Sequence, residues 1–174
     1  MKNLEWKQGK INPKNFWDLE EIKKLEYVKE PFNDEKQLQE WLNKNYLPRT
    51  GYQYNSARTY QPKTSELLKI WATNLKNIGI TYYRMDSGDN LPYHKDLYKK
   101  YIEKFSLKNK ENKIWRYVFF VEDWKPGHIF EIGYNPIIKW KSGDYVAWNY
   151  DIPHLAANLG DESRYTIQLT GEEI

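Results

Sequence analysis

The sequence predicts a mainly β fold, a sandwich or barrel, with a layer of helices in its N-terminal part. From Ile80 onward, short runs rich in β-branched and aromatic residues alternate with turn sequences, which is typical of antiparallel sandwiches and barrels. Before Ile80, apolar residues recur three and four positions apart, as on one face of a helix. Aromatic residues make up 17% of the 174 residues, which provides ample surface for one core. We therefore expect a single domain over residues 1–174, with helices and loops in 1–79 and the β core in 80–171.

Apolar spacing and capping residues define the expected helices. Asn33 and Asp34 are candidate N-caps of the second helix, and Gly79 is a stop signal for the third. The stretch 48–62 contains Pro, Gly and Tyr residues without apolar periodicity, so we expect a loop there. The segments predicted to be helical are 16–25, 34–42, 64–78 and, within the β region, a short helix over 97–105.

Turn chemistry separates the expected strands from one another. The Pro126-Gly127 pair suits a type II turn, and two further reversals contain Gly133 and Gly143. The predicted strands are Ile80–Met85, Pro92–Asp96, Ile114–Val121, His128–Ile132, Pro136–Trp140, Asp144–Trp148, His154–Asn158 and Arg164–Thr170.

Composition and charge limit the classes of function. The absence of cysteine excludes disulfides, thiolate metal sites and a cysteine nucleophile, so a metal site has only three histidines and the carboxylates to use. The formal net charge of +3 is too small to indicate a nucleic-acid binder, and its excess lies in residues 97–113. For that segment we favour a solvated helix face over a surface that steers an anionic partner. No stretch approaches 18 apolar residues and the first ten residues do not resemble a signal peptide, so we expect a cytoplasmic protein without a membrane span.

A metal-binding triad is the strongest chemical signal in the chain. His94 and Asp96 are two residues apart on a predicted strand, which places both side chains on one face. His154 begins a later strand and completes a set of two imidazoles and one carboxylate. This donor set fits the facial triad of a non-haem Fe(II) site, which leaves positions open for other ligands. The H-x-D pattern alone is common, so an incidental Asp beside a surface histidine remains the alternative.

An arginine ten residues after His154 strengthens this interpretation. If the strand of Arg164 pairs with that of His154, Arg164 and Thr166 share one face near the metal. A guanidinium and a hydroxyl in that arrangement suit a carboxylate ligand. The competing interpretation is a surface ion pair of Arg164 with Asp161 or Glu162.

These residues resemble a known family, the 2-oxoglutarate/Fe(II)-dependent dioxygenases, and in particular their prolyl-hydroxylase-like branch. Tyr83, Gly88, Leu91, His94 and Asp96 match a Y-x4-G-x2-L-x2-H-x-D pattern of that family. The downstream residues that resemble its distal metal strand and cosubstrate anchor are Gly143, Trp148, His154, Asn158, Arg164 and Thr166. The resemblance covers about 80–171 and implies a double-stranded β-helix, the jelly-roll fold also found in cupins.

The resemblance also implies roles for individual residues. His94, Asp96 and His154 would hold Fe(II), while Arg164 with Thr166 would bind the far carboxylate of 2-oxoglutarate. Tyr83 would place a further hydroxyl near the same cosubstrate. The implied reaction consumes O2 and 2-oxoglutarate, releases succinate and CO2, and hydroxylates an unidentified prime substrate, either a peptide side chain or a small amino-acid-like molecule.

Other functions remain as alternatives. Gly143, His154 and Asn158 keep the spacing of the second metal motif of cupins, which implies a metal enzyme without 2-oxoglutarate, although the first cupin motif is absent. A non-catalytic β-helix module would bind a sugar or peptide, with Trp115, Trp124, Trp140 and Trp148 as stacking platforms. Nucleic-acid demethylases of the same superfamily have a pattern with a second arginine shortly after the arginine that anchors the cosubstrate. This chain lacks that second arginine, so we do not expect a nucleic-acid substrate. His128 is expected to be a hydrogen-bonding strand residue, with a metal role only as a reserve.

Overall fold

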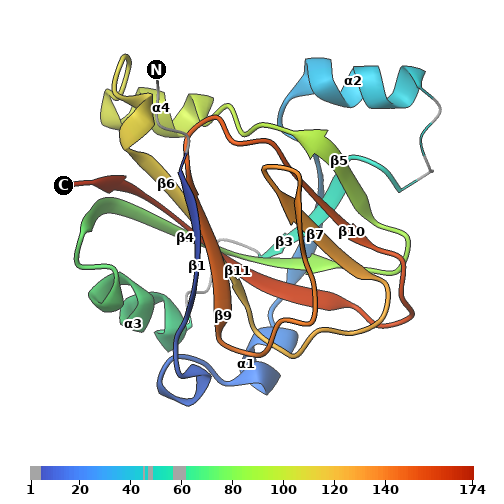
Figure 1. Ribbon diagram of the computed structural model, residues 1–174, viewed down its shortest axis with the longest axis horizontal. Helices are drawn as coiled ribbons and strands as arrows, with labels where there is room; N and C mark the ends of the chain where they lie inside the picture. Colours follow the sequence, from blue (N-terminus) through green and yellow to red (C-terminus); the bar gives the residue numbers. More distant parts are fainter. Residues whose placement is uncertain (1–4, 45, 47–48, 57–61) are drawn as a thin grey trace.

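Two antiparallel β-sheets form the body of the molecule in the computed structural model, which describes residues 5–44, 46, 49–56 and 62–174 (Figure 1). The larger sheet has the strand order β1-β9-β6-β11-β4-β3-β2, and the smaller has the order β5-β10-β7-β8. The strands of the larger sheet are β1 Trp6–Lys10, β2 Tyr27–Pro31, β3 Tyr52–Ser56, β4 Leu75–Met85, β6 Ile114–Phe120, β9 Asp144–Asn149 and β11 Arg164–Glu173. Those of the smaller sheet are β5 Asn90–His94, β7 His128–Ile132, β8 Asn135–Ile137 and β10 His154–Asn158.

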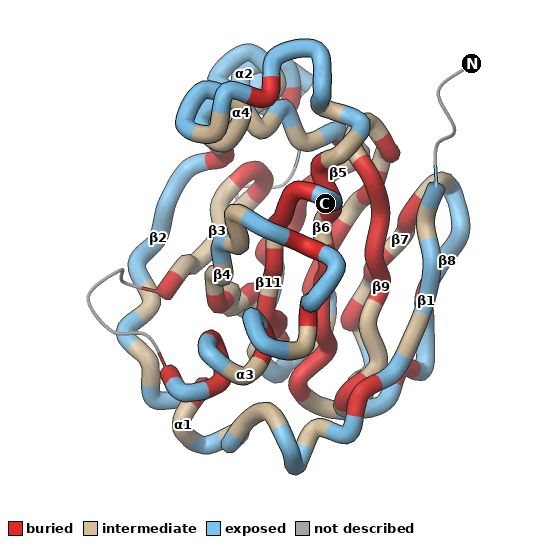
Figure 2. Tube along the Cα trace, turned by 90° about the vertical axis from the view of Figure 1, so that its left-hand side faces the viewer, coloured by how far each residue is buried: buried red, intermediate tan, exposed pale blue. Residues whose placement is uncertain are grey.

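Short helices cover the ends and outer face of this sandwich. The α-helices are α1 Leu19–Lys23, α2 Glu35–Asn43, α3 Lys63–Trp71 and α4 Lys99–Phe105, with 3₁₀ turns at Pro13–Asn15 and Glu111–Lys113. Figure 2 shows α2 and α4 together at one end of the sandwich, with α1 and α3 toward the other end. None of the helices in the described part of the chain is long and apolar enough to cross a membrane.

The path of the chain confirms the predicted double-stranded β-helix. From β4 to β7 the chain alternates between the two sheets at every step, and it does so again from β8 to β11. Between β4 and β11, the β7–β8 hairpin is the one connection that stays within one sheet. Strands far apart in sequence therefore become neighbours, such as β4 beside β11 and β5 beside β10. This arrangement brings the two halves of the predicted site to facing walls.

Alternation along β6 shows how the core is divided. Val118 and Phe120 point between the two sheets, where they pack with Phe130 of the smaller sheet. Tyr117 and Phe119 point to the other face of the larger sheet, where a second cluster includes Leu68 of α3. The larger sheet is thus buried on both faces, which explains why β6 is almost continuously apolar.

The N-terminal part of the chain differs from the sequence prediction. Residues 1–79 were expected to contain helices and loops, but β1, β2 and β3 add strands to both edges of the larger sheet. β3 lies within the stretch 48–62 that was expected to be a loop; residues 47–48 and 57–61 lie outside the described part of the chain. β1 and β2 are edge strands whose residues are mostly exposed, and β3 is mostly half-buried, so all three lack the apolar runs that mark the central strands.

The helix predicted over 64–78 ends early, and that over 16–25 is also shorter than expected. α3 stops at Trp71, and the chain continues into β4 from Leu75, which pairs with β11. Leu75 and Ile78 still pack into the apolar cluster beneath α3. The apolar spacing therefore identified core residues correctly, but these residues lie on a strand and not on the predicted helix. Leu75 and Ile78, three residues apart, can both reach this cluster because the strand is irregular between them: Asn77 adopts a left-handed conformation with φ of 56°.

Candidate metal centre

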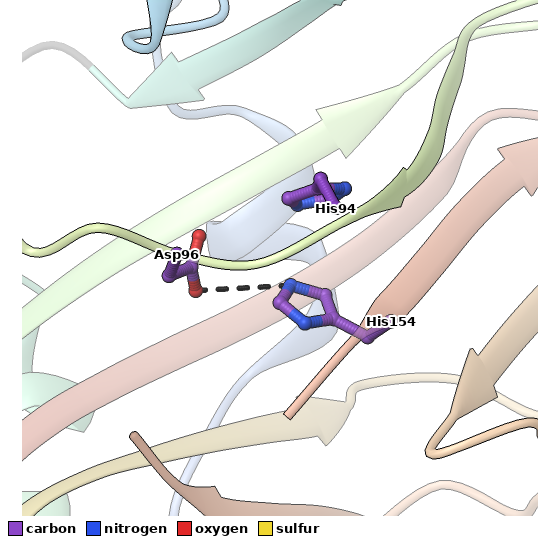
Figure 3. Close-up of side chains that lie close together, drawn as sticks. All are labelled: His94, Asp96 and His154. Carbon is purple, nitrogen blue, oxygen red and sulfur yellow. Dashed lines mark ion pairs between the residues drawn. The ribbon is translucent and has the colours of Figure 1, made fainter. Parts of the chain in front are cut away.

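The structure brings the three predicted metal ligands together at the mouth of the sandwich (Figure 3). One ligand atom of each of His94, Asp96 and His154 lies within 4.8 Å of the other two. His94 ends β5 and is the register partner of His154, the first residue of β10. Adjacent antiparallel strands therefore present both imidazoles on the inner face of the smaller sheet.

Asp96 reaches the site by a different route from the one predicted. The sequence placed it on one strand with His94, but β5 ends at His94 and Asp96 follows in the connection to α4. The carboxylate is brought in by the loop and by its contact with Arg116, whose Nη2 lies 3.4 Å from Asp96 Oδ2. Shared strand faces thus account for the two histidines but not for the aspartate.

Backbone hydrogen bonds orient both imidazole rings. His94 Nδ1 lies 2.7 Å from the carbonyl oxygen of Pro92, and His154 Nδ1 lies 3.0 Å from that of Ile152. A carbonyl only accepts, so both rings carry their proton on Nδ1 and offer Nε2 to a metal. Figure 3 shows the His154 ring directed at Asp96, with 3.7 Å between Nε2 and Oδ2.

Aromatic packing fixes the same rings and keeps them from bulk water. His94 packs edge-on against Phe32 and Trp41, at ring-centroid distances of 4.8 and 5.7 Å. His154 packs against Trp148 at 4.7 Å. Because α2 and its preceding loop supply Phe32 and Trp41, the N-terminal part of the chain supports the metal centre directly.

The electrostatics of the triad favour the protonation states that a metal requires. Burial lowers the pKa of His94, and burial together with the neighbouring His94 lowers the pKa of His154 to about 4. Burial alone would raise the pKa of Asp96, but Arg116, followed by His154 and His94, lowers it to about 2. At neutral pH the site therefore contains two neutral imidazoles and one carboxylate, so a metal can bind without first displacing protons from its ligands.

Arg116 is a site residue that the sequence analysis missed. It lies on β6 facing the sheet interior, where its Nη1 donates to Gln168 Oε1 and its guanidinium lies 5.0 Å above the ring of Tyr98. A signal for it was present, because Arg116 is the one charged residue in the otherwise aromatic and aliphatic run of β6. A cation in such a strand needs a buried anionic partner, which here is Asp96.

Arg164 and Thr166 face the same cavity from the opposite wall. The sequence analysis supposed that their strand pairs with that of His154, but β10 and β11 belong to different sheets. Arg164 reaches the cavity from β11 across the sandwich, next to Met85 of β4. The surface ion pair considered as an alternative does not form: the guanidinium is buried and makes no salt bridge with any described carboxylate.

The contacts of Arg164 leave much of its binding capacity unused. Nη1 donates to the carbonyl of Ile129 at 2.7 Å and Nη2 contacts the sulfur of Met85 at 3.3 Å, whereas Nε has no partner. Burial lowers the pKa of this arginine to about 10. A buried guanidinium without an anion is costly, so this arrangement indicates a position where an anionic ligand binds.

The cavity between the two sheets joins these groups. Its volume is about 90 Å³, well above the roughly 10–15 Å³ that one water molecule needs. Tyr83 of β4 also lines it, directly opposite Thr166 in the strand register, and burial raises the pKa of its hydroxyl. The residues that line the cavity include the triad, the two arginines, Tyr83, Thr166, Gln168 and an apolar set formed by Leu91, Val118, Phe130 and Trp148.

The remaining candidates lie elsewhere. His128 is not part of the metal triad; it is hydrogen-bonded through Nε2 to the carbonyl of Glu162 at 3.0 Å, at the far end of β7. Trp140 and Trp148 are buried in the core, and Trp115 is buried on the outer side of the larger sheet. These tryptophans are therefore core residues, not the exposed stacking platforms that a binding module would present.

Comparisons with known proteins support the fold. No family model matches the chain, and no curated protein matches its sequence. Among solved structures, a prolyl-4-hydroxylase from Pseudomonas putida is 10% identical with a TM-score of 0.55, over 99% of this chain and 94% of that one. A predicted oxalate decarboxylase from Thermotoga maritima is 10% identical with a TM-score of 0.43, over 70% and 82%. A protein with a double-stranded β-helix domain from Klebsiella pneumoniae is 15% identical with a TM-score of 0.37, over 58% and 70%. At 10% identity, the likeness to the prolyl-4-hydroxylase establishes the fold class alone.

Proposed function

We propose that this protein is a 2-oxoglutarate- and Fe(II)-dependent oxygenase that hydroxylates a C–H bond of a prime substrate. One observation carries the proposal: a His-Asp-His triad and a buried arginine without an anionic partner line the same cavity. A metal triad alone would suit many cupin-fold enzymes. A metal enzyme that uses no carboxylate cosubstrate would not need the second feature, the anion-binding arginine.

The donor set fits Fe(II). Two neutral imidazoles and one carboxylate form the set typical of non-haem Fe(II) oxygenases, whereas the cysteine ligands of many structural zinc sites are absent from the chain. Asp96 Oδ2 is buried 3.7 Å from His154 Nε2, and Arg116 Nη2 lies 3.4 Å from the same oxygen, so the carboxylate is held in its ionised form next to the imidazole. Both histidines present Nε2 in a fixed tautomer, as metal ligands with backbone-bound Nδ1 do.

The opposite wall fits the dicarboxylate. Arg164 offers an unpaired guanidinium, and Thr166 and Tyr83 add hydroxyls on neighbouring strands of the same wall. Arginine binds carboxylates through two parallel N–H donors, which gives direction as well as energy. In the proposed reaction, one atom of O2 enters the substrate C–H bond and the other enters succinate, while 2-oxoglutarate loses CO2 and supplies two electrons. The iron provides that redox chemistry, and the chain binds and orients the reactants.

The surrounding residues protect this chemistry. Leu91, Val118 and Phe130 form an apolar lining between the triad and Arg164. Such a lining excludes water, which strengthens the ion pairs inside and limits side reactions. The prolyl-4-hydroxylase with the same overall fold supports the proposal, because in that protein the fold carries a hydroxylation reaction.

Anaerobic spectroscopy tests the proposal. Protein loaded with Fe(II) in the absence of oxygen is titrated with 2-oxoglutarate, and we expect a weak visible charge-transfer band that saturates at one equivalent per chain. Arg164→Lys serves as the matched variant, because it keeps the charge and loses the two-pronged donor; its saturation should require more 2-oxoglutarate. Metal binding without any band at saturating 2-oxoglutarate would refute the proposal and would favour a cupin-type metal enzyme.

A further inference from the structure

A second and larger cavity adjoins the metal centre. It lies between α4, the start of α2 and one end of the larger sheet, and its volume is about 460 Å³. Arg116 and Asn33 line both cavities, so the two spaces share a wall. Both views show α2 and α4 at this end of the sandwich, and Figure 1 shows them on opposite sides of it. The residues lining the second cavity are Asn33, Asp34, Gly79, Thr81, Leu97, Tyr98, Lys99, Lys100, Tyr101, Arg116 and Thr170.

Specific contacts hold α4 in place over this cavity. The hydroxyl of Tyr101 donates to the carbonyl of Asn77 in β4 at 2.9 Å, which ties the helix to the sheet. Tyr98, just before the helix, adopts a left-handed conformation with φ of 50°. This conformation is unfavourable for a tyrosine, and such strain is concentrated at functional positions. Here it accompanies the stacking of the Tyr98 ring beneath the guanidinium of Arg116.

The cavity is lined by an excess of positive charge. Lys99, Lys100 and Arg116 contribute cations, and Asp34 is the only carboxylate among the lining residues that the structure describes. Asp34 is also engaged as the cap of α2, where it accepts from the backbone N–H of Gln37. Within the described part of the chain, neither Lys99 nor Lys100 forms a salt bridge. Two unpaired ammonium groups at a concave surface attract an anion more strongly than they do on an open one.

A buried hydroxyl adds a further polar group at the junction of the two cavities. The hydroxyl oxygen of Tyr98 is buried, and it lies beside the carboxylate of Asp96 and the guanidinium of Arg116. A hydroxyl in this position, next to the cationic groups of the cavity wall, can also contact an oxygen atom of a ligand.

We propose that this second cavity binds the prime substrate, and that the substrate is a small carboxylic acid of about amino-acid size. The inference rests on the oxygenase function proposed above and names the class of molecule that it oxidises. The carboxylate pairs with Lys99 and Lys100, and the carbon chain extends past Tyr98 and Arg116 toward the triad. The volume falls within the range of roughly 300–1,000 Å³ usual for small-molecule sites.

This assignment gives the lysine-rich segment a role in substrate binding, which its composition alone did not indicate. The sequence favoured a solvated helix face for residues 97–113. The structure shows that two of its lysines lie on the wall of a cavity next to the metal centre, while Lys108 does not line it. The position of the charges relative to the site, rather than their number, carries the inference.

Matched acids and amides test the substrate class. Protein with Fe(II), 2-oxoglutarate and O2 is assayed for succinate release with the twenty L-amino acids and with aliphatic carboxylic acids of four to eight carbons. Each acid is paired with its carboxamide, which keeps the shape and removes the charge. We expect at least one acid to raise succinate release above the substrate-free rate, and its amide to fail or to need at least about tenfold more for half-maximal effect.

Variants locate the effect in the cavity. Lys99→Ala/Lys100→Ala should raise the KM for the active acid about tenfold or more, whereas the control Lys108→Ala should leave it unchanged. Equal response to acid and amide, an unchanged KM in the double variant, or stimulation only by peptides blocked at both ends would overturn the proposal, as would no response to any acid tested. The charge-transfer band of the wild-type protein separates this failure from failure of the oxygenase function, because it reports 2-oxoglutarate binding without any prime substrate.

Discussion

Replacing Arg164 by methionine separates the function of this residue from its cost to the fold. Methionine is similar in length and apolar, so it fills the site without the buried charge. Burial lowers the pKa of Arg164 from its ordinary 12.5 to about 10, which corresponds to about 3 kcal/mol of unfavourable desolvation. That cost is present in the protein without a ligand, where no carboxylate among the described residues balances the guanidinium.

The opposing term is the hydrogen bond from Arg164 to the carbonyl of Ile129. Its loss leaves a buried acceptor without a donor, which costs about 1–3 kcal/mol. The difference predicts that metal-free Arg164→Met is as stable as the wild type, or up to about 2 kcal/mol more stable. Removing one partner of a buried charge pair costs about 2–5 kcal/mol in binding, so 2-oxoglutarate should bind at least about thirtyfold more weakly.

Two measurements check this pair of predictions. Urea unfolding of the metal-free proteins gives the free energies of unfolding, and anaerobic titration of the Fe(II) proteins gives the 2-oxoglutarate dissociation constants. Arg164→Lys is the control, with charge kept and an intermediate loss of affinity expected. An unchanged dissociation constant in Arg164→Met would refute the anchor role, and a loss of stability above about 3 kcal/mol would show that the guanidinium mainly supports the fold.

Three further predictions concern the triad and Arg116. His154→Ala should abolish Fe(II) binding, measured by equilibrium dialysis, whereas His128→Ala should retain it because His128 lies outside the triad. Burial lowers the pKa of His154 in the folded protein to about 4, whereas in the unfolded chain this histidine has its ordinary pKa of 6.5. As the pH falls from 6.5 toward 4, the unfolded state therefore binds the proton more readily, and the folded state loses stability. The metal-free wild type should lose about 2 kcal/mol more than His154→Ala between pH 7 and 4.5 in urea unfolding; parallel curves would contradict this. Arg116→Gln leaves Asp96 buried without its cation, so the metal-free protein should lose about 3 kcal/mol, and a divalent metal should restore part of it; an equal deficit with and without metal would exclude this role.

The β core was predictable because its signals are local. Short aromatic and β-branched runs such as Ile114–Phe120, bounded by turn residues, fix strands irrespective of their partners. The edge strands were missed for a physical reason. β2 is mostly exposed and β3 mostly half-buried, and both carry polar residues. Their strand conformation depends on pairing with each other and, for β3, with β4 rather than on their own sequence.

The site divides in the same way. His94 and Asp96 were found from their spacing and His154 from its place at the start of a strand, although the reason given for Asp96 was wrong because β5 ends at His94. Arg164 was found with an incorrect strand partner, since β10 and β11 lie in opposite sheets. Arg116 was not identified at all. Its importance comes from facing Asp96 across the sandwich, and no short-range pattern encodes that contact.

The sequence by itself determined the donor chemistry, because with no cysteine and three histidines a protein metal site has only imidazole and carboxylate to use. It also determined the fold class, since hydrophobic periodicity and turn residues act over a few positions. Only the tertiary structure decided which groups meet: an unpaired Arg164 opposite the triad, Arg116 beside Asp96, and two lysines on the wall of a neighbouring cavity. These relations depend on a chain that alternates between two sheets, which makes neighbours of residues as far apart in the sequence as Leu75 and Glu173, 98 positions, on β4 and β11.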